Sequence, residues 1–232
     1  MKNKNSVWLY SAHPVFNIKF VPIFENLDQK NSVYLYTLLL SNYLDLIHKI
    51  ELRADFMCFL DERDKEFISK NYLPENFKLY YYFPGEKESF DRELIINQSA
   101  NYSKSVLINC NSIGVSESTI NKIFNLLSSE DESIVIGRTT KNTLAFMGFN
   151  RYGDELNTGF QSALFDYDKF LGSISSKNHF LTVLDGFLAL NDFDDFRELY
   201  FRLSKKDSLA YCSEVMHEKF NNIFIEYKER LK

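Results

Sequence analysis

Glycine and proline are scarce in this chain of 232 residues, which has 8 glycines and 4 prolines. It lacks the G-x-G-x-x-G and Walker lysine patterns of phosphate-binding loops and the G-x-S-x-G pattern of serine hydrolases. No stretch rich in proline, glycine and serine divides the sequence. These absences exclude the most familiar nucleotide-binding loops. They favour a single domain over residues 1–232, a length that one domain can accommodate.

Cysteine is also rare, and the three residues Cys58, Cys110 and Cys212 are far apart in the sequence. They show neither C-x-x-C spacing nor the histidine spacing of a zinc site. We therefore expect buried free thiols, as is usual in a reducing cytoplasm. No run of 18 apolar residues exists, so we expect no membrane span and a cytoplasmic location.

Positive charge is neither in excess nor concentrated. The 27 lysines and arginines face 32 acidic residues, giving a net charge of −5, and no basic block interrupts their distribution. A broad positive face for nucleic acid is therefore not expected. The four histidines are scattered and suggest no catalytic triad.

The stretch over residues 105–149 organises the rest of the chain. Residues 106–108 form a short apolar run, typical of a strand buried in a parallel sheet. Ser116 precedes apolar residues at helical spacing and is a suitable N-cap for a helix that extends to Leu127. Residues 134–136 form a second apolar run, so the stretch predicts a βαβ unit. Residues 144–149 are close enough to pair with the second strand as a hairpin.

Further apolar patterns predict an α/β domain with a mostly parallel central sheet and helices on both faces. Strands are expected at residues 7–10, 54–60 and 77–83, with one or two more within 180–190. Helices are expected at residues 31–49, 89–102 and 195–203, with a final helix at 208–231. The charged run at 61–66 is most simply a solvated helix start.

Ligands of open α/β sheets lie beyond the carboxyl ends of the strands. Residues 109–112 and 138–143 are therefore expected to form the rim of a site. The loop after the first strand could hold a nucleotide phosphate with Lys19 and His13, or could be a polar loop with a solvated lysine. Asp192 and Asp194 form a D-x-D, which could share a divalent cation or belong to a helix N-cap.

Four segments, in this order and spacing, resemble the DUF2064 group of small bacterial glycosyltransferase-A-like proteins, known as nucleotide-diphospho-sugar transferases. The segments are 11–19 (S-A-H-P-V-F-N-I-K), 109–115 (N-C-N-S-I-G-V), 135–149 (V-I-G-R-T-T-K-N-T-L-A-F-M-G-F) and 190–199 (L-N-D-F-D-D-F-R-E-L). The family patterns are A-K-x-P-x-P-G-x-x-K-T-R-L, G-x-D-x-P-x-L, V-x-G-P-A-x-D-G-G-Y-x-L-x-G-L and L-x-D-x-D-T-x-x-D-L. The resemblance implies the GT-A-like fold of these proteins.

The chain departs from the family at the site. The family's first acid, which would help hold metal and nucleotide, aligns with Asn111, and its second acid aligns with Lys141. The arginine of the opening loop is missing, whereas Asp192 and Asp194 remain. An amide is a poorer ligand than a carboxylate for a hard dication. A conventional Mg²⁺ or Mn²⁺ site is therefore not expected.

Two hypotheses follow from the resemblance and these departures. In the first, the chain transfers a sugar from a nucleotide-sugar donor without a metal. Lys141, with Arg138 or Lys19, would neutralise the leaving diphosphate, and Asp192 or Asp194 would act as base toward the acceptor. In the second, the chain is a catalytically inactive relative that binds a ligand or a partner protein of a biosynthetic pathway.

The resemblance thus implies a set of nucleotide-binding residues. Ser11, His13 and Lys19 would contact the nucleotide phosphate, with Arg138 near it, and Asn111 would stand at the former metal position. The expected partners are a nucleotide or nucleotide-sugar, and either a protein partner or a second copy of this chain.

Overall fold

A computed structural model describes residues 4–49, 54–69, 72–73, 77–82, 98–128, 131–151, 166–174 and 180–231. The elements in chain order are β1 (Asn5–Tyr10), α1 (Gln29–Lys49), β2 (Ala54–Asp61), a 3-10 turn (Glu62–Asp64), β3 (Phe77–Tyr82), β4 (Lys104–Asn109), β5 (Ser112–Ile113), α3 (Glu117–Leu126), β6 (Ser133–Thr139), β7 (Leu144–Phe149), α5 (Tyr167–Ile174), β8 (Phe180–Ala189), α6 (Phe193–Leu203), a second 3-10 turn (Lys206–Ala210), α7 (Glu214–Glu226) and α8 (Lys228–Leu231).

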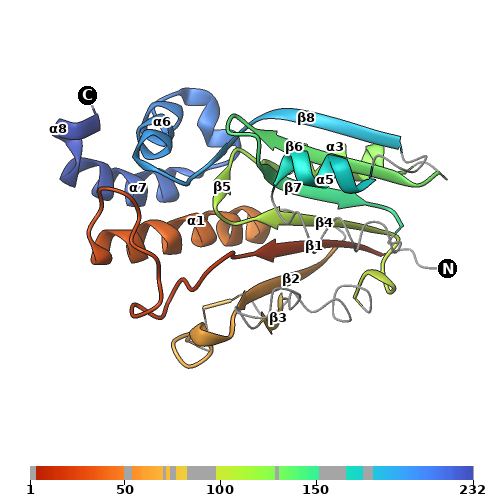
Figure 1. The fold of residues 1–232 in the computed structure, drawn as a ribbon, viewed down its shortest axis with the longest axis horizontal. Coiled ribbons are helices and arrows are strands. Elements are labelled where there is room, and N and C mark those ends of the chain that lie inside the picture. Colours follow the sequence, from red (N-terminus) through yellow and green to blue (C-terminus); the bar gives the residue numbers. More distant parts are fainter. Residues whose placement is uncertain are drawn as a thin grey trace.

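The strands form one sheet in the order β3-β2-β1-β4-β7-β6-β8-β5. β1 pairs in parallel with β2 and β4, β2 pairs in parallel with β3, and β6 pairs in parallel with β8. β7 runs antiparallel to both β4 and β6, and the short β5 runs antiparallel to β8. The mostly parallel sheet and the hairpin at residues 144–149 are thus confirmed. All the long strands except β7 end at the same edge of the sheet (Figure 1).

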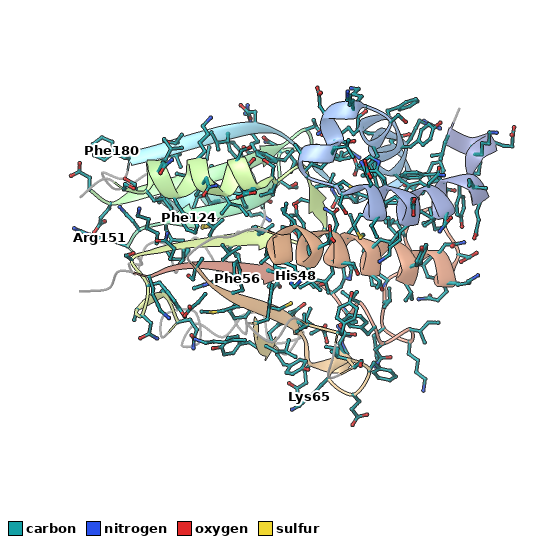
Figure 2. The ribbon with its side chains drawn as sticks, turned by 180° about the vertical axis from the view of Figure 1, so that it is seen from behind. His48, Phe56, Lys65, Phe124, Arg151 and Phe180 are labelled. Carbon is teal, nitrogen blue, oxygen red and sulfur yellow. The ribbon has the colours of Figure 1, made fainter. Side chains whose placement is uncertain are left out.

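Both faces of the sheet are apolar, which explains why the central strands read as continuous apolar runs. One face carries Val7, Leu9, Val106 and Ile108 against α1, α3, α6 and α7. The other carries Trp8 and residues of neighbouring strands against α5. Helices α1 and α3 lie in front in Figure 2, whereas α5 lies in front in Figure 1. Helices on both faces were predicted from the sequence.

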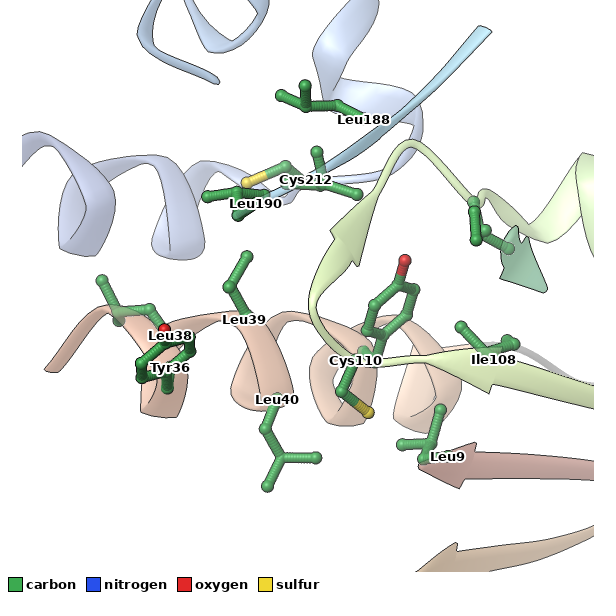
Figure 3. Packing of buried hydrophobic residues seen from close by; sticks show 14 of the residues in the cluster. Leu9, Tyr36, Leu38, Leu39, Leu40, Ile108, Cys110, Leu188, Leu190 and Cys212 are labelled. Carbon is green, nitrogen blue, oxygen red and sulfur yellow. The ribbon is translucent and has the colours of Figure 1, made fainter. Parts of the chain in front are cut away.

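Helix α3 begins as its sequence predicts, whereas α1 begins at Gln29, two residues before the expected start. The Ser116 side chain accepts a hydrogen bond from the Thr119 amide and caps α3. The apolar side of α1, including Leu35, Leu39 and Tyr43, belongs to the larger hydrophobic cluster, which lies on this face of the sheet. The cysteines Cys58, Cys110 and Cys212 are free and buried, as expected. Figure 3 shows Cys110 and Cys212 within the larger cluster.

Two expectations about local structure are wrong. The charged run at 61–66 is not a solvated helix start, because Asp61 and Asp64 are fully buried and the run forms only a short 3-10 turn. The segment 208–231 is not one helix. It is divided into the second 3-10 turn, α7 and α8, and α7 starts anew where Ser213 caps it.

Three further expectations concern the strand at 180–190 and the helices at 195–203 and 89–102. Residues 180–190 contain the single strand β8, and the helix expected at 195–203 starts two residues earlier as α6. Residues 89–97 of the helix expected at 89–102 lie outside the described residues. Among the helices that the structure describes, none is long and apolar enough to cross a membrane.

Candidate functional site

The loop between β1 and α1 lies beyond the carboxyl ends of the parallel strands (Figure 1). Its first residue, Ser11, is buried, and its hydroxyl donates to the carbonyl of His13 at 2.8 Å. The Tyr82 hydroxyl, at the end of β3, donates to the Ser11 carbonyl at 2.6 Å. The predicted nucleotide residue Ser11 therefore fixes the start of the loop, and its hydroxyl is already used within the chain.

Asp64 holds the next part of the same loop. Its carboxylate accepts hydrogen bonds from the backbone amides of Val15 (2.8 Å), Phe16 (2.9 Å) and Asn17 (2.8 Å). Burial raises the pKa of Asp64, and the three amide bonds act against that effect by favouring the charged form. The Asn17 side chain also donates to the Arg63 carbonyl at 2.9 Å, which makes a further link between loop and turn.

His13 and Asn111 meet across 98 residues of sequence, with His13 Nε2 2.9 Å from Asn111 Nδ2. The other ring nitrogen, Nδ1, lies 2.9 Å from the Pro14 carbonyl oxygen. A carbonyl only accepts, so Nδ1 carries the proton and Nε2 accepts from the Asn111 amide. Burial lowers the pKa of His13, with the bond to the Pro14 carbonyl opposing it, so the imidazole is neutral at pH 7. This uncharged pair links the segment that follows β1 to the segment that follows β4.

Lys141 lies beside two carboxylates at the start of α6. Its ammonium donates to Asp192 and lies 3.0 Å from Oδ1 of Asp195. Asp195 is buried, and its other oxygen accepts from the amide of Asn191 at 2.9 Å. Asp192 caps α6 and forms a capping box with Asp195. The helix-cap interpretation of this acidic segment is thereby confirmed.

The ion pairs shift the pKa values of both partners. The hydrogen bond from Lys141 lowers the pKa of Asp192, although partial burial opposes it. Burial acts to lower the pKa of Lys141, but the hydrogen bonds to Asp192 and Asp195 outweigh it and the pKa is raised. Asp192 and Lys141 are therefore both charged at pH 7. Lys141 is exposed at the turn between β6 and β7, with 38% of its side chain accessible, and it still binds both carboxylates.

The two pairs belong to one edge of the sheet. The Asn111 carbonyl accepts a hydrogen bond from the Leu190 amide at 2.8 Å, and Leu190 is two residues before Asp192. Five of the eight predicted site residues are therefore joined by short links: Ser11, His13, Asn111, Lys141 and Asp192.

The other three predicted residues are placed apart from this set. Arg138 donates to Asp185 at 2.7 Å and lies over the Tyr167 ring, on the face covered by α5. Asp194 is mostly exposed and pairs with Arg197 at 3.1 Å, whereas Asp192 pairs with Lys141. Lys19 is exposed further along the loop, and no hydrogen bond or ion pair within the described part of the chain joins it to the set.

A metal ion does not fit the carboxylates as they stand. Lys141 already binds both Asp192 and Asp195, which leaves no vacant position between them for a dication. Within the described ranges, no group of three histidine, cysteine, aspartate or glutamate side chains could hold a metal. The arrangement thus contains an internal cation at the sheet edge that also contains Asn111, where the resemblance puts the metal.

A polar groove of about 500 Å³ adjoins the acidic end of this edge. It is lined by Glu25, Asn26, Phe193, Asp194, Arg197, Glu229 and Arg230. Glu25 belongs to the loop after β1 and accepts from the Phe193 amide at 3.2 Å. Phe193 and Asp194 directly follow Asp192 in the chain and line the groove, whereas Lys141, Asp192 and Asp195 are not among its lining residues.

Sequence reasoning did not find Asp64, Asp195 or Tyr82. Asp64 is one acid in a charged run, and nothing in the run marks it as buried. A signal for Asp195 was present, because an acid three residues after an N-cap aspartate is the capping-box spacing. Tyr82 contacts the loop from the end of β3, and the sequence does not reveal where β3 lies in the sheet.

No family model and no curated protein matches this sequence. Solved structures do match. A protein from Desulfovibrio desulfuricans described as a nucleotide-diphospho-sugar transferase has a TM-score of 0.74 at 14% identity, over 99% of this chain and 97% of that chain. A cytidylyltransferase from Leptospira borgpetersenii has a TM-score of 0.53 at 10% identity, over 98% and 95%. The 4-diphosphocytidyl-2C-methyl-D-erythritol synthase from Anaerococcus prevotii has 0.52 at 13% identity, over 79% and 87%.

At these identities the likeness concerns the fold. The chain has the α/β fold of nucleotide-diphospho-sugar transferases and cytidylyltransferases, as the sequence predicted. Membership of the DUF2064 group stays a prediction, as do the roles of the individual site residues.

Proposed function

We propose that this chain binds a nucleotide-sugar at the carboxyl edge of its sheet and transfers the sugar without a divalent metal. The observation that carries the proposal is the position of Lys141. Its ammonium is bound to Asp192 and Asp195 on the edge that contains Asn111, in a chain with the nucleotide-sugar transferase fold. A fixed cation at the site of developing negative charge lowers the barrier as a metal would.

The buried Asp195 would keep Lys141 charged and in place, while the half-exposed Asp192 exchanges with the ligand. Oxygens of the donor diphosphate would replace Asp192 as partners of the ammonium. The Asp192 carboxylate would then be free to take the proton of an acceptor hydroxyl as the acceptor oxygen bonds to the sugar. The bond from the sugar to the diphosphate would break, and Lys141 would hold the leaving nucleotide. The adjoining groove offers room for the acceptor.

A second candidate is a catalytically inactive relative that binds a ligand or a partner protein. It is favoured because the polar groups of the site already have hydrogen-bond or ion-pair partners within the chain. His13 is bonded on both ring nitrogens, the Ser11 hydroxyl is used, and Lys141 has two carboxylate partners. In that case the internal pairs would stabilise the edge and no donor would be cleaved.

The test is a thermal-shift panel of UDP, GDP, CDP, dTDP and their common sugars, with and without Mn²⁺. Ligand at about 100 times its Kd stabilises a fold by about 2.7 kcal/mol, which raises Tm measurably. The proposal expects one nucleotide to raise Tm equally with and without Mn²⁺, and Lys141→Met to abolish that rise. The matched control is Lys122→Met, a lysine exposed on α3 away from the site.

Donor hydrolysis separates the two candidates. With the nucleotide-sugar that binds, the enzyme releases free nucleoside diphosphate, slowly to water and faster with an acceptor. Binding with no release under any acceptor mixture would favour the inactive relative. No rise in Tm with any member of the panel, in a folded sample, would contradict nucleotide-sugar binding.

A further inference from the structure

Three consecutive amides of the loop after β1 converge on one carboxylate. The amides of Phe16 and Asn17 donate to Oδ1 of Asp64 at 2.9 and 2.8 Å, and the amide of Val15 donates to Oδ2 at 2.8 Å. Asp64 is fully buried, with 0% of its surface exposed. Successive backbone amides that point into one concavity form an anion site, the arrangement that cradles phosphate in many proteins. In this chain the anion in the concavity belongs to the protein itself.

The position of this concavity matters for ligand binding. The loop follows the first strand of an open α/β sheet at the carboxyl edge, where doubly wound folds bind nucleotide phosphates through backbone amides. The loop over residues 11–20 contains no glycine, so it has little freedom to open a second concavity. A phosphate could reach the amides of Val15–Asn17 only by displacing a buried carboxylate of like charge.

The turn that presents Asp64 is itself well fixed. Asp61 accepts from the amide of Arg63 and binds its guanidinium with both oxygens, at 2.8 Å to Nε and 2.6 Å to Nη2. The Asn17 side chain donates to the Arg63 carbonyl, and Arg63 lies over the Phe20 ring at 5.0 Å. These contacts join the loop to the turn that carries Asp64, and they hold the Asp64 carboxylate in the concavity.

We propose that Asp64 is a specificity-determining residue: a built-in anion that fills the phosphate cradle of the loop after β1 and closes it to phosphate. For nucleotides, and resting on the proposed function, the consequence is that the diphosphate is held on the Lys141 side of the edge and not by the loop. The filled cradle itself does not depend on that function, so it is tested with small anions and without any nucleotide.

The experiment compares the wild type with Asp64→Ala, which empties the cradle, and with Glu66→Ala, which removes an exposed acid two residues away. Each protein is titrated with formate, with inorganic phosphate and with chloride at equal ionic strength. Tm and the NMR shifts of the Val15, Phe16 and Asn17 amides are followed. Should Asp64→Ala not fold, Asp64→Ser, whose hydroxyl keeps one acceptor, takes its place.

We expect these amides of the wild type and of Glu66→Ala to show no saturable response to formate, phosphate or chloride. Asp64→Ala should melt lower than the wild type and regain stability saturably with both formate and phosphate. At about 100 times Kd the rise would be about 5–10 °C, accompanied by shifts confined to the three amides. A merely structural aspartate would lower Tm without such rescue.

Either of two results overturns the inference. Saturable phosphate shifts at these amides in the wild type would mean that the cradle is open despite Asp64. An emptied variant that recovers with formate but ignores phosphate, or ignores both, would mean that the concavity fits only a carboxylate side chain. Neither result bears on nucleotide binding at Lys141, so the two proposals fail separately.

Discussion

Lys141→Met removes the ammonium that binds both Asp192 and Asp195 while keeping a side chain of similar length. The loss of stability comes mainly from Asp195, which is left without its cation and whose side chain is only 4% exposed. Breaking a fully buried ion pair costs about 3–5 kcal/mol, whereas an exposed pair contributes about 0.2–1 kcal/mol. The Lys141 side chain is 38% exposed, so in the variant water can partly solvate the carboxylates that the ammonium has left. We expect a loss of about 1–2 kcal/mol, or about 2–8 °C in Tm.

The pH dependence of this loss follows from the directions of the pKa shifts. The pKa of Asp192 is lowered, so its contribution is present above its unfolded value of about 3.9 and is lost as pH falls through the folded value. The pKa of Lys141 is raised, so its contribution is present below about 10.4 and is lost as pH rises through the folded value. The difference between wild type and Lys141→Met should therefore be flat around neutral pH and shrink at both extremes.

The assay is urea unfolding followed by circular dichroism, with Lys122→Met as the control. A double-mutant cycle with Asp192→Asn reports the coupling between the two side chains. The reasoning would be refuted if Lys141→Met at pH 7 lay within about 0.5 kcal/mol of the control, the usual range for a surface substitution. A difference that grew as pH fell below about 4 would refute the charge assignment.

Three further predictions concern other parts of the fold. The pKa of His13 is lowered, so the unfolded chain binds the proton more tightly than the folded chain. The stability of the wild type should therefore fall as pH drops below about 6.5. Urea unfolding midpoints should show this fall, and it should be smaller in His13→Gln. Ser116→Ala removes the cap that accepts from the Thr119 amide at 3.2 Å and should lower the free energy of unfolding by about 1 kcal/mol in urea. Gly137→Ala places a methyl group against the Phe146 ring and should cost about 1–3 kcal/mol, seen as a lower Tm.

The sequence predicted elements well where one periodicity dominated a segment. The runs at residues 7–10, 54–60 and 106–108 are strands because their side chains are buried on both faces, which needs continuous apolar residues. The sequence could not reveal that 208–231 is divided, because the apolar positions of α7 alone satisfy the helical pattern.

The candidate site was predicted less completely because it depends on the directions in which side chains point, and the sequence does not specify these. Arg138 lies in β6 and Lys141 follows that strand. The Arg138 side chain lies on the face covered by α5, while Lys141 reaches the cap of α6. Asp194 and Asp195 are adjacent acids, yet one is exposed and the other buried, because helical geometry turns them about 100° apart. Only the pairing of β1 with β4 brings His13 to Asn111.

The central claim is that the edge containing Asn111 and Lys141 binds a nucleotide-sugar without a metal. Isothermal titration calorimetry tests it most directly, using the donor that gives the largest thermal shift, once in EDTA and once in Mn²⁺. The account predicts one site with the same Kd in both buffers, lost in Lys141→Met and kept in Lys122→Met. Binding that appears only with Mn²⁺, or that survives Lys141→Met unchanged, would contradict it.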